Sequence, residues 1–226
     1  LLVPFGGAPA PLAFPGDLVL LCGLLALMRF ATVLAALDTG SSFEGMGASR
    51  EVLFAALAEP ALVLALAVVV RSAGSPSLGG ALAALRQGIG TGSGAPLLLV
   101  AGASFIVLLA ECSRIPVDDP CTHLELTMIH EVMVLDHGGL DLGFVQYAAA
   151  LKLWVLGALL VGLALPVRGL VPWAGWLVSL TGMLVLAVLV GIVETVMARL
   201  KLVRVPQLLA GATALSVLAI VLVTRG

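Results

Sequence analysis

The sequence predicts an all-α fold: a polytopic transmembrane helical bundle with about six spanning helices and a cytoplasmic amphipathic helix or loop. The chain is 61% hydrophobic and only 11% charged, and its mean hydropathy is +1.20. Apolar runs of about 18 residues or more recur, which is the length that crosses a bilayer as a helix. The runs are continuous rather than alternating, and this pattern argues against a closed barrel of strands.

Six apolar segments fit this length. We expect them at about 17–37, 52–71, 95–112, 143–165, 172–197 and 206–224. Pro and Gly mark the connections, as in GSPSLGG and LPVRGLVP. We therefore treat residues 1–226 as a single membrane domain whose largest polar connection is an acidic loop over 113–142.

The start of the chain, LLVPFGGAPAPLAFPGD, has no initiator Met. It also lacks the charged start and small-residue cleavage site of a signal peptide. We expect this stretch to be a loop, and we expect further sequence upstream of it.

The basic residues give the orientation. The side that carries 38–51, 113–142 and 198–205 holds five Lys and Arg residues, and the opposite side holds four. The RLKLVR run adjoins a span end, where the positive-inside rule counts most. We assign this first side to the cytoplasm.

The glycine-rich stretch DTGSSFEGMGASRE, residues 38–51, joins the first two spans. It lacks the lysine and the spacing of a phosphate-binding loop, so nucleotide binding is not indicated. A tight loop packed beneath a partner subunit explains the glycines better.

One polar window interrupts the apolar sequence. ECSRIPVDDPCTHLELTMIHEVMVLDH, residues 111–137, contains six of the thirteen acidic residues and all three histidines. Its segment 120–135 is apolar enough to suggest a seventh span, but it carries two acids and two histidines. An acid at a bilayer centre costs about 2.5–3.5 kcal/mol. We expect a helix that lies at the membrane surface or folds back into the bundle.

The first half of this window should turn sharply. Arg114 stands between Glu111 and Asp118, and Pro116 and Pro120 prevent one continuous helix. Arg114 can therefore fold back against Glu111 or Asp118, so that acids and a guanidinium converge at the cytoplasmic surface.

No metal or nucleic-acid site is indicated. His123, His130 and Glu131 would share one face of a helix over 120–135, but ligands spread over two turns need a further segment to converge on one ion. We favour histidines that are hydrogen-bonded within an acidic network. The three cysteines form no CxxC pair, and no basic cluster is available to bind phosphates.

Ionisable residues inside the spans are the first functional candidates, because each must be paired, hydrated or functional. They are Arg29, Glu59, Glu111, Lys152 and Glu194. Snorkelling or buried ion pairs explain Arg29 and Glu194 best, since both lie near a cytoplasmic end. Glu59 lies deepest, where ionisation is costly, and this suits a group that takes up and releases a proton.

With these residues in view, a family resemblance follows. AECSRIPVDDP resembles the cytoplasmic-loop signature of the membrane subunit that anchors the peripheral arm of respiratory complex I, and the pair Arg50 and Glu59 fits that family as well. RIPVDDPCTHLELTMIHE, LDTGSSFEGMGASRE and ARLKLVRVPQLL resemble its hydrogenase branch, the membrane subunits of formate hydrogenlyase and hydrogenase-4-type complexes. The likeness covers essentially the whole chain.

The chain departs from the family pattern at three places. Cys121 and His123 stand where the quinone-reducing branch has acids, as in the hydrogenase branch. Asp136 and His137 stand where an acid–tyrosine pair is usual, so only the role of the acid carries over. Family members have eight spans, and we expect the first two to be missing from this chain.

The resemblance implies a non-catalytic subunit of a membrane-bound nickel–iron hydrogenase complex, in the cytoplasmic (inner) membrane of a bacterium or archaeon. The subunit would anchor the soluble redox arm and couple its electron transfer to proton or sodium translocation. The implied partners are the hydrogenase large and small subunits, iron–sulfur subunits and antiporter-like membrane subunits. Nickel–iron and iron–sulfur centres would lie in those partners, and this chain would bind no cofactor, with a quinone as the alternative.

The resemblance and the charge pattern together assign two sets of residues. The set expected to couple protons contains Glu59, Glu111, Asp118, Glu125, Glu131, Asp136, Lys152 and Glu194. The set expected to dock the arm or support the structure contains Arg50, Arg114, Asp119, His123, His130, Arg199 and Arg204. Two alternatives remain open: a quinone-site subunit of an NADH:quinone oxidoreductase-like complex, and a purely structural anchor.

Overall fold

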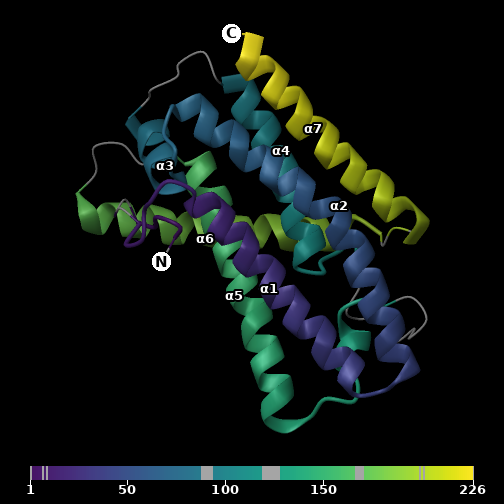
Figure 1. Ribbon diagram of the computed structural model, residues 1–226. Coiled ribbons are helices and arrows are strands. Elements are labelled where there is room, and N and C mark those ends of the chain that lie inside the picture. Colours follow the sequence, from purple (N-terminus) through teal and green to yellow (C-terminus); the bar gives the residue numbers. More distant parts are fainter. Residues whose placement is uncertain are drawn as a thin grey trace.

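Every regular element in the described part of the computed structural model is a helix, and this confirms the predicted fold class (Figure 1). The structure describes residues 1–226 except 1, 7, 9, 88–93, 119–127, 166–170, 199, 201 and 226. Within that part, 6 helices are long and apolar enough to cross a membrane. They are α1 (Asp17–Asp38), α2 (Ser42–Ala73), α4 (Gly94–Glu111), α5 (Gly139–Ala164), α6 (Pro172–Val196) and α7 (Val205–Arg225).

Helix α2 begins ten residues earlier than the expected span, so most of the loop predicted over 38–51 is helical. Ser41 has the extended backbone angles of an N-cap residue, and the acidic residue Glu44 in the first turn complements the helix dipole. These first turns are polar, and hydropathy alone therefore placed them outside the span. Gly47 serves packing within the chain, since a Cβ there would lie 2.9 Å from the carbonyl oxygen of Ile129.

The core lies where α2, α4 and α7 pack together. Small residues allow the close approach of α2 and α7: Ala61 and Ala212 are both fully buried. Ser216 is also fully buried, and its hydroxyl donates to the carbonyl of Ala61 at 3.0 Å. Fully buried residues of α7 recur every three or four positions and so form one face: Val205, Leu209, Ala212, Ser216 and Ala219.

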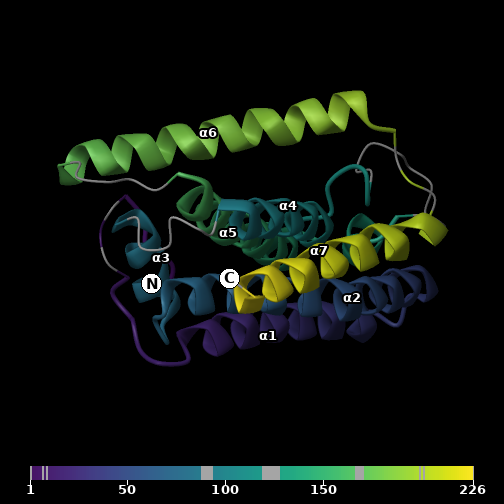
Figure 2. The same cartoon turned by 90° about the horizontal axis from the view of Figure 1, so that it is seen from above.

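Helices α1 and α6 lie at opposite edges of the molecule, with α4 and α5 between them (Figure 2). The N-terminal segment ties α5 to α6, because the ring of Phe5 contacts both Trp154 and Trp176. The amide of Gly6 donates to the Ser179 hydroxyl at 3.2 Å. Gly6 has φ +64° and lies directly beneath Trp176, so a larger residue would be both strained and obstructed.

A short helix that the sequence analysis missed, α3 (Leu78–Gln87), follows α2. The hydroxyl of Ser77 accepts a hydrogen bond from the amide of Gly80, as N-capping serines do. The fully buried carboxylate of Asp17 accepts a hydrogen bond from the amide of Leu78 at 2.6 Å. A carboxylate from the start of α1 therefore holds the start of α3.

The surface helix expected over 120–135 is not an α-helix where the structure describes it. Residues 120–127 lie outside the described residues, and 128–135 form turns and the 3-10 helix Glu131–Val134. The amides of Ile129 and His130 donate to the Asp118 carboxylate, so they are not available to a preceding helical turn. The segment packs against α2, and the side chains of Ile129 and Met133 are buried.

Candidate functional site

Five ionisable side chains from four helices meet in the part of the molecule between α1, α2, α4 and α5. We call them the Arg29 cluster: Arg29 of α1, Glu51 and Glu59 of α2, Glu111 of α4 and Lys152 of α5. Glu51 and Glu59 are eight residues apart, which places them on the same face of α2 about two turns apart. Two cations and three carboxylates leave one negative charge in excess when all five are ionised.

Arg29 is the centre of the cluster. Its Nη2 lies 2.6 Å and 2.7 Å from the two carboxylate oxygens of Glu111, and its Nη1 donates to Glu59. Its Nε lies 3.7 Å from a carboxylate oxygen of Glu51. A buried guanidinium next to lipid needs such partners, because an unpaired charge there is very costly.

Lys152 contributes the second positive charge. Its Nζ lies 3.0 Å from the Glu111 carboxylate and donates at 2.7 Å to the backbone carbonyl of the same residue. Glu111 is the last residue of α4, so this carbonyl has no partner within its own helix, and a cation there also complements the helix dipole. Lys152 lies 3.9 Å from Glu51 as well.

The three carboxylates of the cluster differ in how far their side chains are buried. The side chain of Glu59 is 43% exposed at the surface of the chain. The buried acids are Glu111 and Glu51, whose side chains are 5% and 12% exposed. Glu51 was absent from the predicted site because it was assigned to a loop. Arg29 was assigned to snorkelling or a buried ion pair, and the structure shows the ion pair. The spacing of eight residues between Glu51 and Glu59 was the available signal.

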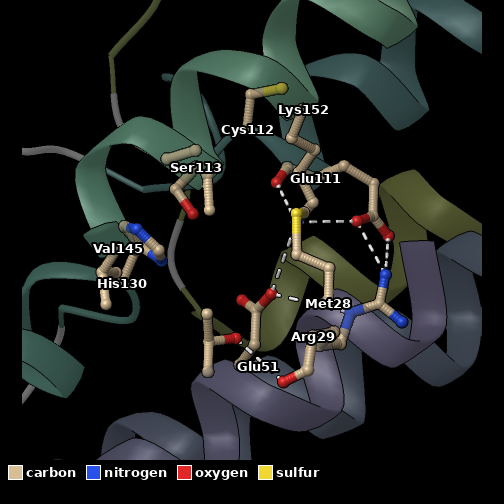
Figure 3. Close-up of a pocket in the computed structure, with 12 residues that line it drawn as sticks. Met28, Arg29, Glu51, Glu111, Cys112, Ser113, His130, Val145 and Lys152 are labelled. Carbon is tan, nitrogen blue, oxygen red and sulfur yellow. Dashed lines mark hydrogen bonds and ion pairs between the residues drawn. The ribbon is translucent and has the colours of Figure 1, made fainter. Parts of the chain in front are cut away.

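A small cavity of about 40 Å³ adjoins the cluster (Figure 3). Arg29, Glu51, Glu111 and Lys152 line it, together with His130 from the connection between α4 and α5. A cavity of this size with several polar groups can hold a few water molecules. The cavity therefore connects the intramembrane charges with the polar window identified in the sequence.

Two charged residues fix the part of the window that faces the cavity. The buried carboxylate of Asp118 accepts hydrogen bonds from the amides of Ile129 and His130 at 3.0 Å and 3.1 Å. Arg50 of α2 donates to the carbonyl of Met128 at 2.9 Å. Burial lowers the pKa of the His130 imidazole and nearby Lys152 lowers it further, while Asp118 acts in the opposite direction.

A second buried acid holds the far end of the window. Glu44 is fully buried, and one carboxylate oxygen accepts from the amide of Asp136 at 2.8 Å. The same oxygen lies 3.6 Å from Nδ1 of His137, and the other accepts from the hydroxyl of Thr39. These contacts tie the α1–α2 connection to the segment that precedes α5.

Arg114 does not form the predicted contact with Glu111 or Asp118. The backbone turns after Glu111 as expected, but the Arg114 side chain extends toward α6, where its Nη1 lies 3.5 Å from Glu194. Glu111 is already bonded to Arg29 and Lys152, and Asp118 faces backbone amides. Glu194 therefore belongs to a separate, more exposed pair.

The remaining predicted residues lie at the periphery or outside the described residues. Glu131 is half-buried in the 3-10 helix that begins there, and the side chains of Asp136 and Arg204 are exposed. Asp119, His123, Glu125 and Arg199 lie outside the described residues. Within the described part of the chain, no three His, Cys, Asp or Glu side chains form a group that could hold a metal ion.

The chemistry that this arrangement supports is charge and proton transfer. Carboxylates in contact with cations in a low-dielectric environment respond strongly to a nearby change of charge. Cys112, which also lines the cavity, is not a reactive thiolate, because burial raises its pKa to about 12. The ionisable groups in contact are the three carboxylates, Lys152 and Arg29, and the imidazole of His130 lines the same cavity.

Comparison with known proteins places these features in context. The family model described as NADH dehydrogenase matches residues 1–224. Hydrogenase-4 component C of Escherichia coli (strain K12) is 36% identical over 159 residues, which cover 70% of this chain and 48% of that protein. Formate hydrogenlyase subunit 4 of the same organism is 31% identical over 216 residues, covering 88% of this chain and 66% of the relative. The chain thus matches about half to two thirds of the length of these relatives.

A solved structure has the same fold. A chain of the membrane-bound sulfane sulfur reductase (MBS), an archaeal respiratory membrane complex, superimposes with a TM-score of 0.71. The match covers 85% of this chain and 64% of the other at 22% sequence identity. At that identity the likeness supports the fold alone.

Proposed function

The chain belongs to the NADH dehydrogenase family, and from this premise we propose that it is an integral membrane subunit of a nickel–iron hydrogenase complex. It anchors a soluble redox arm at the cytoplasmic face of the inner membrane and couples electron transfer in that arm to ion movement. The printed names of two relatives, components of hydrogenase-4 and formate hydrogenlyase, support the choice of complex. The chain itself is multi-pass and would hold the arm at the membrane.

The observation that carries the coupling role is the Arg29 cluster and its contact with the polar window. Three carboxylates contact two cations, and two of these carboxylates, Glu51 and Glu111, are buried in the bundle. His130, from the connection that would face the arm, lines the same cavity as Glu51, Glu111 and Lys152. A purely structural anchor would not need an excess carboxylate at this depth, where each charge is costly.

The coupling is electrostatic. Two unit charges about 10 Å apart at an effective dielectric constant near 20 interact by about 1.7 kcal/mol, which is more than one pKa unit. A change of charge in a docked arm near the window can therefore alter the protonation of the cluster. The cluster then passes the change to neighbouring antiporter-like membrane subunits, which translocate protons or sodium ions.

The test is to neutralise the excess carboxylate within the intact complex. In inverted membrane vesicles, Glu51→Gln and Glu59→Gln should each abolish most of the ion movement per electron transferred, because the neutral amide cannot change its protonation. Electron transfer from the arm to an artificial dye should continue. Glu194→Gln is the matched control. The sequence placed Glu194 in the coupling set, but its carboxylate contacts Arg114 outside the cluster, and this variant should pump normally.

Normal pumping in both Glu51→Gln and Glu59→Gln would reduce the role of the chain to that of an anchor. Loss of pumping in Glu194→Gln as well would point to a general effect of removing a carboxylate and would contradict the assignment to the cluster.

A second candidate is a quinone site, and one cavity favours it. A largely apolar cavity of about 370 Å³ lies between α1 and α5 and is lined by residues such as Leu24, Leu151 and Val155. Lys152 also lines it and could donate to a quinone carbonyl. A quinone analogue that inhibits electron transfer in the wild type and inhibits it less in Leu24→Trp would favour the quinone site. Activity that is insensitive to such analogues would exclude it.

A further inference from the structure

His130 occupies an unusual position for a residue outside the spans. It lies in the connection between α4 and α5, yet its side chain lines the cavity that adjoins the Arg29 cluster. In Figure 3 its imidazole faces the cavity from the side opposite Arg29 and Lys152, with Ser113 beside it. An imidazole with access to both the window and the cluster can connect the two.

Three contacts from different parts of the chain hold the backbone around His130. Asp118 accepts hydrogen bonds from the amides of residues 129 and 130, and Arg50 donates to the carbonyl of Met128. Gly47 lets this segment approach α2 closely, because a Cβ there would meet Ile129 and Met133 at 2.9–3.0 Å. The position of His130 is therefore specified by the fold and does not result from a loosely held loop.

The surroundings of His130 favour a neutral imidazole. Burial and the charge of Lys152 lower its pKa, and Asp118 acts in the opposite direction. The other ionisable groups of the cavity are Glu51 from α2, Glu111 and Cys112 from the end of α4, and Arg29 from α1. A neutral imidazole has one ring N–H that can donate and one ring nitrogen that can accept a proton. This form can relay a proton without remaining charged.

We propose that His130 transfers protons between the aqueous side of the polar window and the Arg29 cluster. The proposal rests on the coupling function proposed above. In the transfer step, one ring nitrogen takes up a proton from a hydronium ion on the aqueous side, which leaves a water molecule. The other ring nitrogen releases its proton to a carboxylate of the cluster, directly or through water in the cavity, so the ring ends as its other neutral tautomer. The imidazole is neutral before and after the step, and the carboxylate gains one proton.

The experiment uses the whole complex in inverted vesicles and measures protons moved per electron. This ratio counts only assembled, electron-transferring complexes, so a loss of folded protein does not imitate the effect. A positioned proton-transfer group contributes about 10²–10⁴ in rate. Electron transfer to an artificial dye that continues while proton delivery is slowed in His130→Gln should therefore lower the ratio at least about tenfold. His137→Gln is the matched control. That histidine lies in the same connection beside Glu44, away from the residues that line the cavity, and its ratio should equal that of the wild type.

A second variant separates proton transfer from a structural role. In His130→Ala, imidazole added to the buffer should restore the ratio in a concentration-dependent manner. Failure of imidazole to restore it, combined with a low ratio in His130→Gln, would assign His130 a structural role and overturn the proposal.

The outcomes also distinguish this proposal from the function on which it rests. A normal ratio in His130→Gln together with a low ratio in Glu51→Gln would overturn the role of His130 and leave the coupling function in place. Normal ratios in both His130→Gln and the two cluster variants would overturn both proposals.

Discussion

Two arginine–glutamate contacts in this chain differ in burial and in geometry. Nη2 of Arg29 lies 2.6 Å from Oε1 of Glu111, and the two side chains are 8% and 5% exposed. Nη1 of Arg114 lies 3.5 Å from Oε1 of Glu194, and those side chains are 38% and 27% exposed. Both pairs join residues that are 80 or more positions apart in the sequence.

The difference shows where charge matters most in a membrane subunit. Water can hydrate an exposed pair, so its contribution to stability is small. A buried pair has no such alternative, and losing one partner leaves an uncompensated charge. The Arg29 cluster is thus an arrangement in which each charge depends on the others, whereas Arg114 and Glu194 could separate with little consequence.

The largest expected effect comes from removing the centre of the buried cluster. Arg29→Gln leaves three carboxylates facing Lys152 alone, and we expect a loss of about 3–5 kcal/mol in the free energy of unfolding. Unfolding of the purified protein in mixed micelles with increasing SDS would measure it. Arg29→Lys is the matched control and should lose less than Arg29→Gln. It keeps the charge but not the guanidinium fork, whose Nη2 contacts Glu111 while Nη1 contacts Glu59. A loss below about 1 kcal/mol in Arg29→Gln would mean that the cluster is hydrated like a surface pair.

An intermediate effect is expected at the contact between the cluster and the window. Asp118→Ala removes the acceptor of two backbone amides. We expect a loss of about 1.5–3 kcal/mol in the free energy of unfolding, the amount typical of losing a hydrogen bond to a charged group. Asp118→Asn keeps one oxygen as an acceptor and should lose less. Asp136→Ala, at an exposed position of the same window, should remain within about 0.5 kcal/mol of the wild type in the same unfolding assay. Equal losses in Asp118→Ala and Asp136→Ala would contradict the bracing role of Asp118.

The smallest effect is expected at the exposed pair. Arg114→Gln should lower the free energy of unfolding by about 0–1 kcal/mol, because solvent screens the contact. A double-mutant cycle sharpens the comparison: the coupling of Arg114 with Glu194 should be below about 1 kcal/mol, and that of Arg29 with Glu111 should be clearly larger. If the two coupling energies are equal, burial does not distinguish the two pairs.

Several features of the fold and site could be predicted from sequence. The six spans were found within a few residues, except at the start of α2, because apolar length is a local property of the chain. Two of the three cluster carboxylates, together with Lys152, were among the predicted residues. Glu51 was missed because the polar first turns of α2 resemble a loop in a hydropathy profile. The contact of Arg114 was predicted wrongly because spacing along the chain cannot show that Glu111 is already occupied by Arg29 and Lys152.

The sequence by itself determined that this chain is a multi-pass helical membrane protein with its polar groups concentrated in one window. Both properties follow from the cost of placing charge in hydrocarbon, which acts on each segment separately. Only the tertiary structure decided which charges meet. The rotation and close packing of α1, α2, α4 and α5 bring Arg29, Glu51 and Lys152 to the end of α4. That arrangement depends on contacts between segments far apart in the chain, and no local pattern encodes it.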